Sequence, residues 1–375
     1  MNTEDDLRDS LRIFAAAASR MESPAAAWAN LRAEMPTAKR RRRVVRPRLV
    51  VAGGLALTLG GAFLAADVVS HDSSPLPGTA ADASTFLADA AAQANANPDA
   101  PIPPGQFRQI TIQQTYLYEF GTKKIFRATT HMQIDKWVTA DPTRQYLARV
   151  QELVRVDFAT PEARVAARTL APHLFARPEP RLYRMTCKGA AIEPRTPPDV
   201  VNAPCTPGWQ LPTALFLASL PRDPDALLAA LRKDTPPAGR PVTPLELARA
   251  KATTPDQRAL SRIGVVLNSG IAPADLRAAL YQAAAKIPGI QLLDDVVALD
   301  GRHGRAIGLT YNGYRQDIII SPSNGQSIGS RLVVSKDGAA LPNGESNVAG
   351  ALRAGDVYNA VSFTTRLTTA APPTK

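Results

Sequence analysis

Histidine, cysteine and paired carboxylates are the side chains best able to do chemistry in this chain of 375 residues. Its histidines stand apart from one another, without the spacing of a catalytic or metal-binding motif: His71, His131, His173 and His303. The sequence also lacks the patterns of serine hydrolases, zinc proteases, phosphate loops, dinucleotide sites and kinases. We therefore expect no enzyme, no metal and no cofactor.

Three polar clusters have both a chemical and a structural interpretation. Residues 300–305, Asp-Gly-Arg-His-Gly-Arg, fit a small anion-binding turn, but also a hairpin turn in which Gly301 and Gly304 supply positive φ. Two carboxylate pairs fit acid–base work, but also a strand end and a helix N-terminus: Asp294 with Asp295, and Asp223 with Asp225. The structural interpretation is expected for all three.

Aromatic side chains on the first predicted strands are the candidates for a ligand groove: Tyr116, Tyr118, Phe120 and Trp137. Aromatic residues on paired strands more commonly pack in a core or against a cross-strand neighbour. Both interpretations stay open at the level of sequence.

The two cysteines, Cys187 and Cys205, flank a segment rich in proline and small residues. An oxidising compartment favours a disulfide between them, and closing such a loop contributes about 3 kcal/mol in the chain-entropy treatment. The alternative is two unpaired thiols. A metal site is not expected, because neither cysteine has another ligand at metal-site spacing.

An uncharged apolar stretch runs from Leu49 to Ala66 and organises the rest of the chain. As a helix it would reach ~27 Å, enough for the hydrocarbon core of a bilayer. The basic run 39–43 precedes it, which places the N-terminus in the cytoplasm and the C-terminal part outside. A buried core helix and a cleaved signal peptide are the alternatives, but the stretch lacks a polar face and follows a long N-terminal tail.

The net charge of +11 is divided along the chain. Residues 1–48 carry +5 of it, beside the predicted membrane helix, where basic residues set topology and meet anionic lipid. No basic element that reads nucleic acid is visible, so we expect no nucleic-acid partner.

The predicted organisation has four parts: a cytosolic tail 1–48 with an amphipathic helix, a transmembrane helix 49–69, a tether 70–104 with a helical piece at 83–94, and an extracytoplasmic α+β domain 105–370. In that domain, alternation predicts strands from residue 106 and from 125. The segment 146–158 is ambiguous between strand and helix, and 160–212 is irregular.

Three helices are expected in series after residue 211 of the α+β domain. The first has Asp223 as its N-cap, the second begins at Thr254 and Pro255, and the third runs from Pro273 to Lys286. A strand-rich tail follows, so antiparallel strands lie at both ends of the domain.

Four stretches between Leu217 and Gly329 resemble an uncharacterised actinobacterial family of single-pass membrane proteins named after a locus tag: SLPRDPDALLAALR, APADLRAALYQAAAKIPGIQ, LDGRHGRAIGL and DIIISPSNGQSIG. Such proteins are often encoded beside extracytoplasmic-function sigma factors, so the resemblance implies an anti-sigma or co-regulatory role. The element order is also similar to lipoprotein-carrier folds, in which a curved antiparallel sheet holds lipid or peptide. Two features depart from these patterns: Ser321-Pro322 replaces an expected acidic residue, and the tail lacks the His and Cys of zinc-type anti-sigma domains.

Two functions compete on this basis. The first is a plasma-membrane binding and sensing protein, whose outer domain detects an envelope ligand and whose tail contacts a cytosolic regulator such as a sigma factor. The second is an envelope carrier or scaffold for lipid or lipoprotein. An extracytoplasmic enzyme is the most distant alternative.

Overall fold

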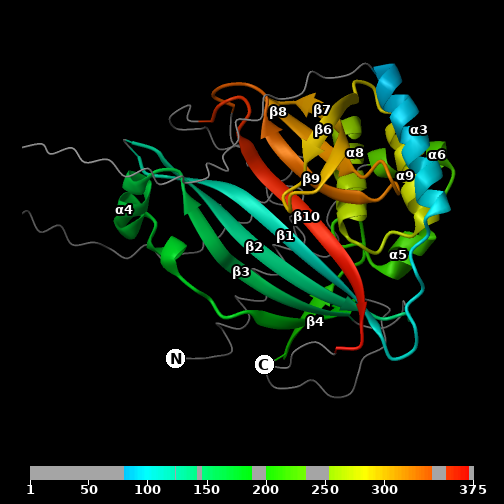
Figure 1. Ribbon diagram of the computed structural model, residues 1–375, viewed down its shortest axis with the longest axis horizontal. Coiled ribbons are helices and arrows are strands. Elements are labelled where there is room, and N and C mark those ends of the chain that lie inside the picture. Colours follow the sequence, from blue (N-terminus) through cyan, green and yellow to red (C-terminus); the bar gives the residue numbers. More distant parts are fainter. Residues whose placement is uncertain are drawn as a thin grey trace, which may run out of the picture.

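The computed structural model describes residues 80–122, 124–141, 146–187, 200–233, 253–339 and 352–370. They form an α+β fold with one large mixed sheet of ten strands and several helices (Figure 1). The predicted tail 1–48, the predicted membrane helix 49–69 and the start of the predicted tether lie outside the described residues. No helix within the described ranges has the length and apolar character needed to cross a bilayer.

The sheet consists of two meanders that join at its centre, in the order β5-β4-β3-β2-β1-β10-β9-β8-β7-β6. Its strands are β1 (Phe107–Phe120), β2 (Phe126–Val138), β3 (Tyr146–Phe158), β4 (Arg181–Cys187), β5 (Val200–Cys205), β6 (Gln291–Val297), β7 (His303–Tyr311), β8 (Tyr314–Ile320), β9 (Ser327–Val334) and β10 (Val357–Thr368). Strands β1 and β10 pair antiparallel from Phe107↔Thr368 to Tyr116↔Asn359 and join the two meanders. Strand β5 runs parallel to β4, which corrects the expectation of a wholly antiparallel sheet.

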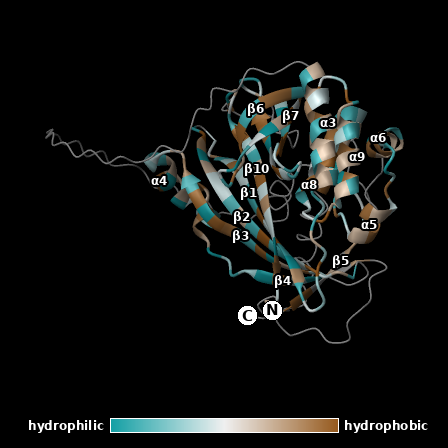
Figure 2. Cartoon of the chain, turned by 45° about the vertical axis from the view of Figure 1, so that its right-hand side comes forward, coloured by the Kyte–Doolittle hydropathy of each residue, from teal (hydrophilic) through white to brown (hydrophobic). Residues whose placement is uncertain are grey.

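Most helices gather beside the C-terminal meander. The described helices are α3 (Ala80–Ala96), α4 (Pro161–Leu170), the short 3₁₀ helix η1 (Pro172–Phe175), α5 (Ala214–Ser219), α6 (Pro224–Arg232), α8 (Pro255–Asn268) and α9 (Ala274–Ala284). Figure 1 shows α3, α6, α8 and α9 close together, while α4 lies at the far end of the long strands. Figure 2 shows the same grouping from another side, with β3 and β4 away from these helices.

The predicted helix starts are confirmed where a capping side chain defines them. Asp223 accepts the backbone N–H of Ala226 at 2.9 Å and begins α6. Thr254 and Gln257 form a reciprocal capping box at the start of α8. The third helix begins one residue later than expected, because Pro273 occupies the N-cap position of α9.

Helix α3 belongs to the main core, although the sequence suggested a helical piece inside a tether. Its Leu87 is fully buried, and Phe86 and Ala94 are buried in the same cluster as Leu276 and Leu280 of α9. The helix presents an almost continuous apolar stripe that water does not favour, and α9 covers that stripe. The folded unit therefore includes residues from Ala80 onward.

Two further segments differ from expectation. The ambiguous segment 146–158 is strand β3, because its alternation places Ala148 and Val150 on one buried face. The stretch 160–212, expected to be irregular, contains α4, η1, β4 and β5. Thr160 caps α4, since its hydroxyl oxygen accepts the N–H of Ala163 at 3.1 Å. Prolines at helix starts and strand edges account for the misleading composition.

Candidate functional site

A small cavity lies where the end of β2 meets the connection between α8 and α9. Its volume is about 50 Å³. The described residues that line it come from five parts of the chain: Lys136, Val138, Thr139, Asp141, Tyr146, Cys187, Pro207, Pro212, Thr213, Ala214, Leu215, Ser269 and Ile271. Both sheet and helix connections therefore build its wall.

Strand alternation aims Lys136 at this cavity. In the register of the sheet Lys136 lies between Ile110 of β1 and Ala148 of β3, both of which are buried. Neighbours in register share a face, so Lys136 interrupts an otherwise apolar row. Tyr146 lies two residues before Ala148 on the same face, within reach of a long side chain at position 136.

The connection 269–272 forms the opposite wall and presses against β1. Gly270 has a φ of +71°, and a Cβ at this position would meet Cγ2 of Ile110 at 2.7 Å. Only glycine combines this backbone conformation with so close an approach. The hydroxyl of Ser269 donates to the carbonyl of Val266 at 2.6 Å and accepts the N–H of Ile271 at 3.3 Å, which closes the turn.

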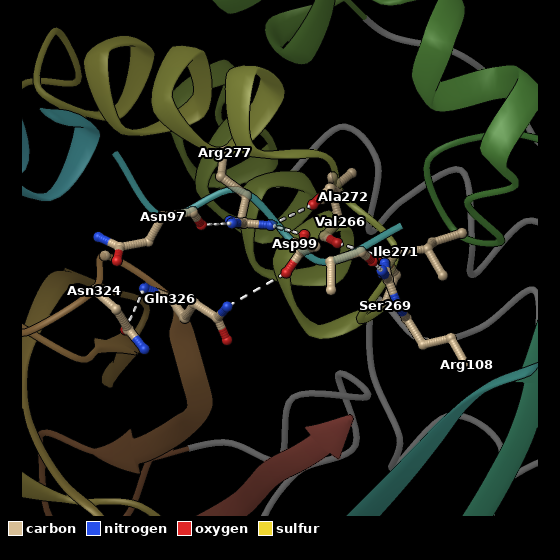
Figure 3. Close-up of polar contacts among 12 residues, drawn as sticks. Asn97, Asp99, Arg108, Val266, Ser269, Ile271, Ala272, Arg277, Asn324 and Gln326 are labelled. Carbon is tan, nitrogen blue, oxygen red and sulfur yellow. Dashed lines mark hydrogen bonds and ion pairs between the residues drawn. The ribbon is translucent and has the colours of Figure 1, made fainter. Parts of the chain in front are cut away.

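A polar clamp behind that wall holds the connection in place (Figure 3). The guanidinium of Arg277 donates to the carbonyl of Ala272 at 2.8 Å and pairs with the carboxylate of Asp99. Gln326 donates to the other oxygen of Asp99 at 3.3 Å, and Arg277 also reaches the carbonyl of Asn97. Arg277 is buried, so this network fixes the segment after α3 to both α9 and the β8–β9 turn.

The two cysteines lie close enough together for the predicted disulfide, and they lie beside the cavity. Cys187 and Cys205 are directly opposite in the parallel β4–β5 pair, at disulfide distance, with Cα atoms 4.3 Å apart. Cys187 lines the cavity, and both cysteines belong to an apolar cluster with Ala148 and Met185. The link thus ties the edge strand to the cavity wall.

Two hydrogen-bond donors that face this site have no partner among the residues that the structure describes. No described residue forms a hydrogen bond or ion pair with the ammonium of Lys136 or the hydroxyl of Tyr146. Burial lowers the pKa of Lys136 to about 8 and raises the pKa of Tyr146. In both cases the cause is loss of water around the charged form.

The aromatic residues proposed for a groove do not converge on one site. Tyr118 and Phe120 pack at the end of the sheet that α4 and η1 cover, where Tyr118 meets the ring of His173 edge-on. Tyr116 lies on the same face of β1 as these two, whereas Trp137 follows Lys136 and so faces the other side of the sheet. Phe120 and Trp137 are buried.

The polar clusters singled out in the sequence have surface positions in the structure. Asp294 pairs with Arg305, and His303 contacts the exposed Asp295 at 2.8 Å. Gly301 has a φ of +84° in the β6–β7 turn, as predicted. Gly304 instead lies inside β7, where a Cβ would meet the carbonyl oxygen of Ile320 at 2.7 Å, so close approach and not positive φ explains that glycine.

Histidines and carboxylates do not assemble into a metal site in the part of the chain that the structure describes. No group of three or more His, Cys, Asp or Glu side chains in these ranges has an arrangement that would hold an ion. His131 pairs with Asp157 at 2.8 Å on a polar part of the sheet.

Sequence reasoning missed Lys136 and Tyr146, although one signal was present. The alternation Ile134, Lys136, Val138 places a lysine in an apolar row of a predicted strand. The partners that complete the cavity come from residues 207–215 and 269–271. No local pattern connects these distant segments.

Comparison with models of known protein families, with curated proteins and with solved structures finds no match for this chain. The resemblance to a family of single-pass membrane proteins therefore stays a prediction.

Proposed function

We propose that this chain is a single-pass plasma-membrane protein whose described domain binds a ligand outside the membrane and whose residues 1–48 contact a cytosolic regulator. The observation that carries the binding role is the cavity between sheet and helix connections, because two donors that line it have no partner in the described part of the chain. Both side chains are half-buried. Partial burial of a charged or polar group costs stability, and residues whose pKa is shifted by burial commonly mark functional sites.

The membrane and regulatory parts of the proposal rest on the sequence. The apolar run from Leu49 to Ala66 follows a basic flank, and the cysteine pair at disulfide distance suits an oxidising compartment. A sigma factor of the extracytoplasmic-function class is the first partner to test, as the family resemblance implies. We propose a binding role without catalysis, supported by the separate positions of His131, His173 and His303.

In-cell crosslinking of the full chain tests the regulatory role. We expect recovery of a sigma factor or another cytosolic regulator through residues 1–48. The predicted apolar stripe of the tail contains Leu7, Leu11 and Phe14. Leu11→Asp on this stripe should abolish recovery, whereas Ala16→Asp on the opposite side of the predicted helix should leave it intact. Equal recovery with both variants, or none with the unchanged chain, would contradict this part of the proposal.

Accessibility of introduced cysteines tests the orientation in the same cells. A cysteine at Ser10 should be protected from a membrane-impermeant thiol reagent, whereas one at the exposed Asp89 should react. The reverse pattern, or equal labelling at both positions, would contradict the proposed topology.

The apolar face of β1–β5 that carries Ile110 and Lys136 gives the carrier alternative its support. Residues of two clusters line it, including Ile112, Ile134, Val150 and Met185. The cavity of about 50 Å³ is well below the ~300–1,000 Å³ of sites that enclose a whole small molecule. A small ligand group therefore fits better than a complete acyl chain. Mass spectrometry of lipid retained by the purified full chain would decide between the two.

A further inference from the structure

Lys136 and Tyr146 are two hydrogen-bond donors that line the cavity. They lie on neighbouring strands and on one face of the sheet, and both side chains line the same cavity. Each is partly buried, and no described residue accepts a hydrogen bond from either one. An ammonium and a phenol aimed at one space are complementary to an acceptor that carries negative charge.

The surroundings of these donors are mainly apolar. Val138, Leu215 and Ile271 contribute aliphatic side chains to the lining, and Pro207 and Pro212 add ring carbons. Apolar walls exclude water and so strengthen the attraction between the ammonium and an anion. They also favour a ligand whose charged group continues into hydrocarbon.

The other charged group among the described lining residues is Asp141, at the end of β2. It is already engaged in an interaction of its own. A carboxylate at the rim repels a ligand of high negative charge, so this position disfavours a phosphate dianion more strongly than a singly charged acid.

We infer that this cavity binds the carboxylate of a small aliphatic acid, with the ammonium of Lys136 as counter-ion and the hydroxyl of Tyr146 as hydrogen-bond donor. The inference deepens the proposed ligand-binding role by naming the class of ligand. A cavity of about 50 Å³ accommodates the acid group, and the aliphatic tail lies on the apolar rim formed by Leu215 and Ile271.

The protonation of Lys136 makes this binding sensitive to pH. The pKa of Lys136 is lowered to about 8 by burial. The charged form binds the carboxylate, so affinity should fall about tenfold for each pH unit above 8. The pKa of Tyr146 is raised, which keeps its hydroxyl protonated as a donor across this range.

Competitive acetylation of lysines in the purified full chain tests the site directly. The chain is treated with an acetylating ester at pH 7.5, and the rate at each lysine is read by peptide mass spectrometry. We expect hexanoate to slow acetylation of Lys136 at least about fivefold, because an ion-paired ammonium is not a nucleophile. Lys336 is exposed and outside the cavity lining, so its rate should not change.

Two matched compounds define the chemistry of the ligand. Hexan-1-ol has the same tail without charge, and inorganic phosphate has charge without a tail. Neither should protect Lys136 as hexanoate does. Equal protection by hexanol would show that the carboxylate does not contribute to binding. Stronger protection by phosphate would show that the site binds phosphate in preference to aliphatic acids. No protection by any of the three would overturn the site.

Tyr146→Phe tests the second donor. The variant should need about tenfold more hexanoate for the same protection of Lys136, which corresponds to a lost hydrogen bond to a charged group. An unchanged midpoint of urea unfolding serves as the control for folding, and unchanged protection would exclude a role for the hydroxyl. If hexanoate fails to protect Lys136, crosslinking of a cytosolic regulator through residues 1–48 would be unaffected. Failure of the ligand inference is therefore distinguishable from failure of the regulatory proposal.

Discussion

At the scale of single residues, Lys136 occupies a position at which a lysine lowers the stability of the fold. It stands in an apolar row between Ile110 and Ala148, and burial lowers its pKa to about 8. Lys136 is half-buried and has no ion-pair partner within the described ranges. A charge in this setting costs free energy, whereas an aliphatic side chain of similar length would not. Costs of this kind are typical of functional positions.

Lys136→Met should therefore stabilise the protein at pH 7, by about 1–3 kcal/mol. Between pH 8 and about 10.5 the unfolded chain binds more protons at position 136 than the folded chain, so wild-type stability rises with pH over that interval. The advantage of the variant should shrink over the same interval. Urea unfolding at pH 7 and pH 10 measures both effects, with Lys336→Met as an exposed control. A variant less stable than wild type at pH 7 would contradict this account.

Gly270 makes a second residue-scale prediction, because it combines positive φ with a close contact to Ile110. Gly270→Ala should cost about 2–4 kcal/mol, from backbone strain and steric overlap together. Gly105→Ala is the matched control, since Gly105 has a φ of +75° but open space around it, and should cost only about 1 kcal/mol. Urea unfolding midpoints measure both losses, and equal losses would show that the contact with Ile110 relaxes freely.

At the scale of elements, α3 shows how a helix outside the sheet becomes part of the core. Ala, Phe and Leu form its buried side against α9, and Asp99 just beyond its end is clamped by Arg277. The helix and the clamp together connect the N-terminal end of the described domain to the wall of the cavity. A displacement of α3 would therefore also displace the connection 269–272.

The packing of α3 predicts a large difference between its two sides. Leu87→Ala should destabilise the domain by about 2–5 kcal/mol, because it leaves a cavity against α9. Asp89→Ala on the exposed side of the same helix should change stability by less than about 0.5 kcal/mol. Thermal unfolding of the two variants is the measurement. A small loss for Leu87→Ala would mean that α3 acts as part of a loose tether.

At the scale of the whole molecule, the pairing of β1 with β10 joins two meanders that each have their own apolar clusters. These strands are the first and last of the described sheet, so the pairing depends on contacts between distant parts of the chain. The cavity lies where the two halves come together, with lysine from one half and the α8–α9 connection from the other.

The central position of β1 and β10 predicts their hydrogen exchange. Their amides should exchange most slowly, because opening them requires separation of the two meanders, while the edge strands β5 and β6 should exchange faster. Hydrogen–deuterium exchange followed by mass spectrometry of the full chain measures this order. Independent exchange of the two meanders, with β1 and β10 unprotected, would show that the halves open separately.

Local signals in the sequence account for much of the fold. Alternation predicted the first two strands, and Asp223 and Thr254 predicted the starts of α6 and α8 because capping depends on nearest neighbours. The assignment failed where composition misled, as in 160–212, and where β5 pairs parallel with β4. Both failures involve residues whose partners lie far along the chain.

The sequence by itself determined the α+β class and several helix starts, and it predicted Cys187 with Cys205 as the cysteine pair, because these follow from short-range periodicity, capping and the small number of cysteines. Only the tertiary structure decided that α3 belongs to the core, that Trp137 faces away from Tyr116, and that Lys136 and Tyr146 share a cavity. The register of the sheet and the close approach of Gly270 to Ile110 produce these relations. They depend on long-range packing, for which a local sequence pattern carries no signal.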